Sequence, residues 1–116
     1  MRDILLQVSG VLAIIAALIH GTLAETRIFP KLTIEPARLR TLLRLVWQTS
    51  TAAWIGGGVL LIAAPWMQSD VARHWIVVTF AVVFALCGIG NAVATRGRHF
   101  GWMVLSGVVA LAVAGY

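Results

Sequence analysis

Four apolar segments, separated by short loops, constrain this chain more than any other feature of its sequence. They cover residues 4–23, 42–64, 75–95 and 100–116. An α-helix needs about 20 mostly apolar residues to cross a hydrocarbon core of about 30 Å, and the fourth segment is slightly shorter than that. Only 11% of the residues are charged, against about 25% in soluble domains. The sequence therefore predicts an all-α membrane protein: one domain, residues 1–116, with four transmembrane helices in an up-down-up-down bundle.

The N-terminal segment and the first connection can be described in more detail. The N-terminal segment has the layout of a secretory signal peptide, and we interpret it as the first span. Residues 24–41 form a polar elbow between the first two spans. Pro30 should end any extension of the first helix, and Pro36 suits the first turn of the second. We expect the second helix to begin near Ala37, at the membrane surface.

The distribution of basic residues predicts the orientation. The loops after the first and third spans hold seven of the nine Lys and Arg residues: Arg27, Lys31, Arg38, Arg40, Arg44, Arg96 and Arg98. Basic loops stay on the cytoplasmic side of a membrane. We therefore expect a protein of the bacterial inner (plasma) membrane with both termini outside. The same placement argues against nucleic-acid binding, although Arg96 and Arg98 could hold an anionic lipid headgroup.

Small residues recur about every four positions on three of the spans, which indicates close helix contact in lipid. The sets are Ser9, Ala13, Ala17 and Gly21; Ala81, Ala85, Gly88 and Ala92; and Ser106, Ala110 and Ala114. Gly56–Gly58 would allow a kink or a close crossing in the second span. These contacts could lie within the chain or between chains, so we expect a homo-oligomer or a larger membrane complex.

Each span carries one polar side chain at about the same depth. His20, Gln48, Asn91 and Ser106 should all lie roughly 6–8 Å inside the cytoplasmic boundary, at a rise of about 1.5 Å per residue. Thr51 lies one turn deeper than Gln48. One interpretation is that these five residues hydrogen-bond across helices and hold the bundle together. The other is that they line a ligand-binding pocket, centred on His20, that opens toward the cytoplasm.

A glutamate and an arginine lie at the boundary itself. Glu25 and Arg44 could form an ion pair at the entrance of such a pocket, or they could be independent interfacial charges. His20 and Glu25 are five residues apart, which is about 140° of rotation on a helix. They should therefore lie on different faces, and we do not expect them to act as a catalytic pair.

The sequence offers little support for catalysis. Cys87 has no paired base, and no serine or threonine belongs to a recognisable triad, so we assign no catalytic residue. His20 is the only plausible metal ligand within the membrane, and His99 is separated from it by Arg96 and Arg98. We predict no cofactor.

The favoured function is therefore non-enzymatic: a small membrane subunit or ligand-binding helix bundle with a polar site near the cytoplasmic face. The alternative is an oligomeric transporter of a small solute or ion. A third possibility is a His-dependent metal, haem or quinone protein.

Overall fold

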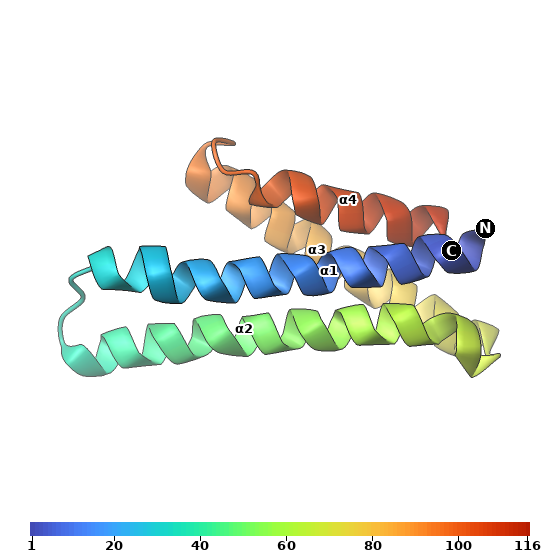
Figure 1. Cartoon of the computed structure of the whole chain (residues 1–116), viewed down its shortest axis with the longest axis horizontal. Helices are drawn as coiled ribbons and strands as arrows, with labels where there is room; N and C mark the ends of the chain where they lie inside the picture. Colours follow the sequence, from blue (N-terminus) through green and yellow to red (C-terminus); the bar gives the residue numbers. More distant parts are fainter.

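The computed structural model describes all residues, 1–116, as four helices with no strands (Figure 1). The helices are α1 (Arg2–Leu23), α2 (Ala37–Ala63), α3 (Asp70–Thr95) and α4 (Gly101–Ala114). α1 continues through a π-helical turn, η1 (Ala24–Ile28), into a 3-10 turn, η2 (Phe29–Lys31), and a second 3-10 turn, η3 (Ala64–Met67), follows α2. The prediction of an all-helical bundle is confirmed.

Three helical stretches are long and apolar enough to span a membrane: Arg2–Lys31, Ala37–Met67 and Asp70–Thr95. The fourth is shorter than predicted. α4 has only 14 residues, which gives it a length of about 21 Å. The loop after α3 delays its start to Gly101, and Gly115 and Tyr116 lie beyond its last residue.

The ends of α2 and α3 follow local signals in the sequence. α2 begins at Ala37, immediately after Pro36. Ser69 caps α3, because its hydroxyl oxygen accepts the Ala72 N–H at 3.2 Å. Pro30 does not stop the first helix at once: it lies inside η2, so the helical stretch ends one residue later, at Lys31.

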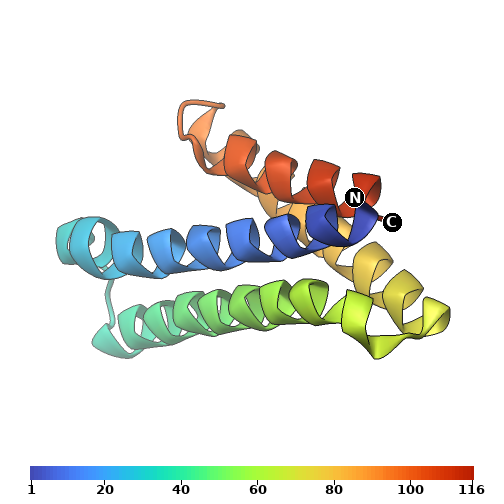
Figure 2. The same cartoon turned by 45° about the vertical axis from the view of Figure 1, so that its right-hand side comes forward.

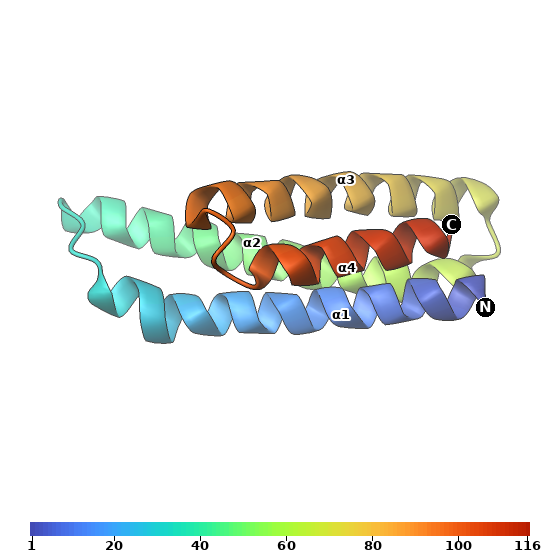
Figure 3. The same cartoon turned by 90° about the horizontal axis from the view of Figure 1, so that it is seen from above.

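The four helices do not form a closed square. α1 lies between α2 and α4, and α3 packs mainly on α4 (Figures 1 and 3). α2 and α3 are close where η3 joins them, and they diverge toward their other ends (Figure 2). We call the end with the loops 24–36 and 96–100 the basic end, and the end with both chain termini the terminal end (Figure 1).

α1 and α2 make backbone contact through two glycines. A Cβ atom added to Gly58 would lie 2.6 Å from the carbonyl oxygen of Gly10, and a Cβ on Gly10 would collide with the carbonyl oxygen of Gly58. The first small-residue set, Ser9, Ala13, Ala17 and Gly21, is buried within the chain, and Gly21 also lies against α2, at Thr51 and Gln48. The small residues of the first span therefore serve contacts within the chain.

α1 also contacts α4, through a buried hydroxyl. The Ser9 hydroxyl, which is fully buried, donates a hydrogen bond of 2.7 Å to the carbonyl oxygen of Val108. Around it lies the core, in which Leu6, Leu61 and Phe84 are the largest fully buried side chains. By contrast, the small residues of the fourth span, Ser106, Ala110 and Ala114, are exposed.

Most of the molecular surface is apolar. Only 20 of 116 residues are buried, and large aliphatic side chains such as Val11, Leu18, Leu45, Leu86 and Val93 are exposed. Soluble monomers rarely expose continuous apolar surface on this scale. This surface and the long apolar helices both indicate association with a membrane.

At the terminal end, Arg73 joins three helices. Its guanidinium donates to the Asp3 carboxylate at the start of α1 and to the Gly115 carbonyl after α4, each at 2.6 Å. The Arg73 side chain is only 19% exposed. This largely buried arginine therefore helps to hold α1, α3 and α4 together at the terminal end.

The contact between α1 and α2 predicts that alanine substitutions at two neighbouring glycines change the free energy of unfolding differently. Gly58→Ala should lower the free energy of unfolding by about 1–3 kcal/mol, because the added methyl group forces the two backbones apart. Gly56→Ala should leave it unchanged or raise it by up to about 1 kcal/mol, because no atom lies within 4 Å of a Cβ there. Thermal unfolding in detergent measures both variants. Equal melting temperatures would show that the backbone contact does not hold the two helices together.

Candidate ligand-binding cavity

The divergence of α2 from α3 leaves a cavity in the half of the molecule nearer the basic end. Its volume is about 470 Å³, and ten of its 16 lining residues are hydrophobic. All four helices contribute to its walls, together with the loop that precedes α4. The size and the apolar lining lie within the usual range of small-molecule sites.

His20 projects from α1 between two tryptophans of α2. Its ring stacks on Trp47 at a centroid distance of 4.6 Å and on Trp54 at 4.5 Å. Trp47 also donates its indole N–H to the His20 carbonyl oxygen at 3.1 Å. Both faces of the imidazole are therefore covered, and only its edge remains for polar contacts.

The hydrogen bonds around His20 determine which ring nitrogen carries the proton in the neutral form. His20 Nε2 lies 3.1 Å from the Ser50 hydroxyl oxygen, and that hydroxyl donates its single hydrogen to the Trp47 carbonyl oxygen at 2.6 Å. Ser50 can then only accept from His20, so Nε2 carries the hydrogen. The other nitrogen, Nδ1, has no hydrogen-bond partner and keeps a lone pair.

The opposite wall is built around the start of α4. The His99 Nδ1 atom accepts the Gly101 N–H at 3.0 Å, and the Asn91 Oδ1 atom accepts the Trp102 N–H at 3.1 Å. Both side chains thus satisfy N–H groups that a helix N-terminus leaves without partners. Because Nδ1 accepts, a neutral His99 carries its hydrogen on Nε2, and the Asn91 amide nitrogen retains two hydrogens. Both residues line the cavity.

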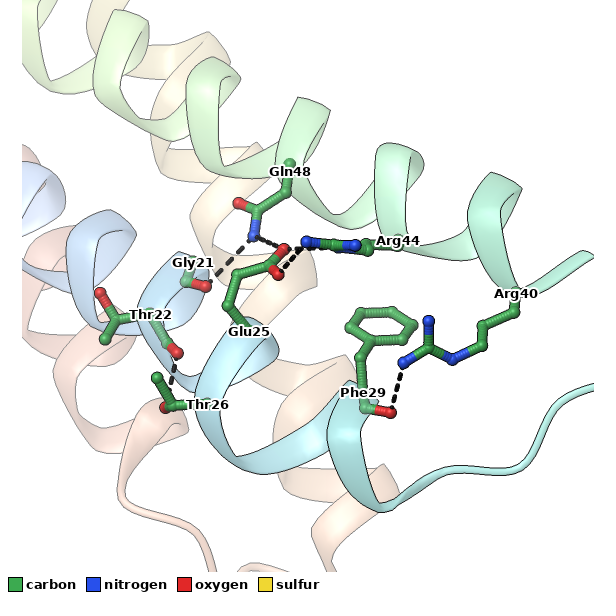
Figure 4. Close-up of polar contacts among 8 residues, drawn as sticks. All are labelled: Gly21, Thr22, Glu25, Thr26, Phe29, Arg40, Arg44 and Gln48. Atoms are coloured by element: carbon green, nitrogen blue, oxygen red, sulfur yellow. Dashed lines mark hydrogen bonds and ion pairs between the residues drawn. The ribbon is translucent and has the colours of Figure 1, made fainter. Parts of the chain in front are cut away.

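A second polar cluster, around Glu25, joins η1 to α2 (Figure 4). Arg44 donates from Nε to Glu25 at 3.0 Å and forms an ion pair with the other carboxylate oxygen at 2.6 Å. Gln48 bridges the same carboxylate, at 2.8 Å, and the Gly21 carbonyl oxygen, at 3.2 Å (Figure 4). The hydrogen bond from Arg44 and, to a smaller extent, the one from Gln48 hold the pKa of the Glu25 carboxyl below its ordinary value.

The polar residues predicted at one depth are divided among separate places. His20 and Asn91 line the cavity, from opposite walls. Gln48 turns toward Glu25, and Thr51 bonds to the Trp47 carbonyl oxygen at 3.3 Å. Ser106 lies on the exposed side of α4 and bonds to the Trp102 carbonyl oxygen at 2.8 Å. Rise along a helix gives depth, whereas rotation about each axis decides which side chains meet.

Glu25 and Arg44 form an ion pair in the structure, and neither of them lines the cavity. His20 and Glu25 point to different partners, as the rotation of about 140° between them requires. No group of three or more His, Cys, Asp or Glu side chains gathers in positions suited to a metal ion.

Sequence reasoning missed several residues of the cavity. Trp47, Ser50 and Trp54 follow a spacing of three and four residues, which places them on one face of α2 and could have identified that wall. His99 was expected to lie away from His20, but both residues line the same cavity. Its position two residues before α4 is the only local signal for this.

Comparisons of the chain with models of protein families, with curated proteins and with solved structures found no match. The arrangement of the side chains is therefore the basis for inferring what the chain does.

The lowered pKa of Glu25 predicts a pH-dependent stabilisation. The carboxylate contributes stability that is fully present above its ordinary pKa and is lost as the pH falls through its lowered, folded-state value. The difference in melting temperature between the wild type and Glu25→Gln should therefore be largest near neutral pH and should shrink below about pH 4. Thermal unfolding in detergent across this range measures it. Glu35→Gln is the matched control, because Glu35 makes no ion pair. A pH-independent difference would contradict the contribution of the ion pair.

Proposed function

We propose that this chain is a small, non-enzymatic integral membrane protein that binds a small, mostly apolar molecule in the cavity near its basic end. The observation that carries the proposal is the cavity of about 470 Å³. His20 and Asn91 line it from opposite walls, among aromatic and aliphatic side chains. A site of this kind is suited to holding and orienting a ligand.

The proposal includes the membrane and the orientation in it. The apolar exterior and the three long apolar helices support insertion. Seven basic residues lie at one end, which supports a cytoplasmic position for the basic end and an outside position for both termini of a bacterial plasma-membrane protein. The cavity then opens in the cytoplasmic half of the bilayer. Arg96 and Arg98, both exposed, would lie at the level of anionic headgroups.

Ligand binding accounts for the cavity better than a purely structural role of its polar residues does. Gln48 and Ser9 fit the structural interpretation, because their hydrogen bonds join neighbouring helices. His20 and Asn91 also use one atom each within the protein. Each has another polar atom, a nitrogen, with no hydrogen-bond partner in the chain, and neither nitrogen is fully buried. A molecule in the cavity would have both within its reach.

Self-association is a second part of the proposal. Ser106, Ala110 and Ala114 form a small-residue edge that α4 does not use within the chain. A second copy packed there would allow close backbone approach. The oligomeric transporter considered from the sequence would require such an assembly, because one chain encloses little volume.

The orientation predicts the behaviour of reporters fused after Tyr116. Alkaline phosphatase, which is active only outside the cytoplasm, should be active when fused there. Green fluorescent protein, which becomes fluorescent in the cytoplasm, should stay dark at the same site. Fusions in the loop 96–100 should behave in the opposite way and serve as controls. A fluorescent fusion after Tyr116 would overturn the proposed orientation.

The cavity predicts that a small molecule co-purifies with the protein. Organic extracts of protein purified in mild detergent should contain it at about one per cavity, as measured by mass spectrometry. Gly90→Phe should remove it, because Gly90 lines the cavity and has open space beside it. Gly56→Phe is the matched control: it adds the same ring at another open position outside the cavity. Equal recovery from both variants, or none from the wild type, would contradict the proposal.

A further inference from the structure

The walls of the cavity exclude charged ligands and favour a neutral one. None of its 16 lining residues is Lys, Arg, Asp or Glu. An ion placed among Trp54, Cys87 and Phe100 would lose its hydration without gaining an opposite charge, which is unfavourable. The only polar complement comes from histidine, amide and hydroxyl groups.

The free polar atoms of the two walls differ in kind. On the α1 side, His20 Nδ1 has a lone pair and can accept a hydrogen bond, because Ser50 already engages Nε2. On the α3 and α4 side, the Asn91 amide nitrogen and His99 Nε2 can donate, because their partner atoms are already used at the start of α4. A matching molecule therefore presents a donor to His20 and an acceptor to Asn91 and His99. A ring hydroxyl serves at either end, whereas a ring carbonyl fits only the end near α4.

The surroundings of these atoms favour a ring with an apolar tail. Three aromatic side chains, Trp47, Trp54 and Phe100, line the cavity and offer flat faces to a ring. A chain attached to the ring can leave beside Gly90, which lines the cavity and has no atom within 4 Å of an added Cβ. The exposed Leu86 lies one turn before Gly90 on α3.

We propose that the cavity binds the headgroup of a membrane quinone, with one ring oxygen facing His20 and the other facing Asn91 and His99. In the oxidised form, the ring carbonyl near α4 accepts from the Asn91 amide. In the reduced form, the ring hydroxyl near α1 donates to His20 Nδ1. This inference rests on the proposed function, because it names the ligand class of the same cavity.

The test uses decylubiquinone and decylubiquinol as probes of the full chain in detergent. Replacing Trp66, Trp75 and Trp102 by Phe leaves Trp47 and Trp54, the two cavity tryptophans, as fluorescence reporters. Both probes should quench them saturably. Gly90→Phe should leave only the linear quenching that comes from probe dissolved in the micelle, and Gly56→Phe should behave as the parent does. Quenching that is linear in the parent protein would overturn the proposal.

Two conservative variants test the two ends of the ring. Asn91→Asp keeps the oxygen that caps α4 but removes the donor, so it should weaken decylubiquinone binding by roughly tenfold, the loss expected for one hydrogen bond. His20→Phe keeps a ring between the two tryptophans but removes the acceptor. It should weaken decylubiquinol binding by a similar factor and affect decylubiquinone less. An equal effect of His20→Phe on both probes would overturn the assigned orientation, because only the quinol has a hydrogen to donate to His20 Nδ1.

The outcome separates the ligand class from the proposed function. If a co-purified molecule depends on Gly90 but is not a quinone, and neither probe quenches saturably, the ligand class is wrong and the cavity function stands. If nothing co-purifies and neither probe binds, both are wrong. A Soret band in the purified protein would identify a haem and overturn the quinone assignment.

Discussion

The fold depends on the backbone contact between α1 and α2 at Gly10 and Gly58. Each glycine occupies space that a Cβ atom on the other would need, so the two helices approach more closely than side chains would permit. In an apolar solvent, where little hydrophobic drive remains between helices, packing of this kind carries most of the association energy. It fixes α1 and α2 as one hairpin, and the other helices are placed against that hairpin.

Polar contacts with α1 determine where α4 and α3 pack against this hairpin. Ser9 fixes α4 at the middle of α1, and Arg73 fixes the start of α3 at the terminal end. No comparable contact joins α2 to α3 near the basic end. There, Asn91 and His99 instead accept N–H groups at the start of α4. The cavity thus follows from which helix pairs have close contacts and which pair lacks them.

The sequence predicts the helices well because their signals are local. Hydropathy gives the apolar stretches, Pro36 and Ser69 mark the starts of α2 and α3, and small residues mark the contact side of α1. The site is predicted less well, because it depends on rotation and tilt. Of the polar residues predicted at one depth, His20 and Asn91 line the cavity, whereas Gln48 and Ser106 face elsewhere. His99 lies in a loop, where hydropathy and periodicity do not predict which way a side chain points.

The difference between Gln48 and Asn91 shows how a structural amide can be told from one that is available to a ligand. Gln48 donates to two acceptors, Gly21 and Glu25, so its amide nitrogen has no hydrogen left to offer. Asn91 uses its oxygen to cap α4 and keeps its nitrogen free. The cap also fixes the direction of that nitrogen, because exchanging oxygen and nitrogen would place a donor against the Trp102 N–H. The same contact that starts α4 therefore fixes the Asn91 amide, so the binding that we propose would require no rearrangement of the fold at that wall.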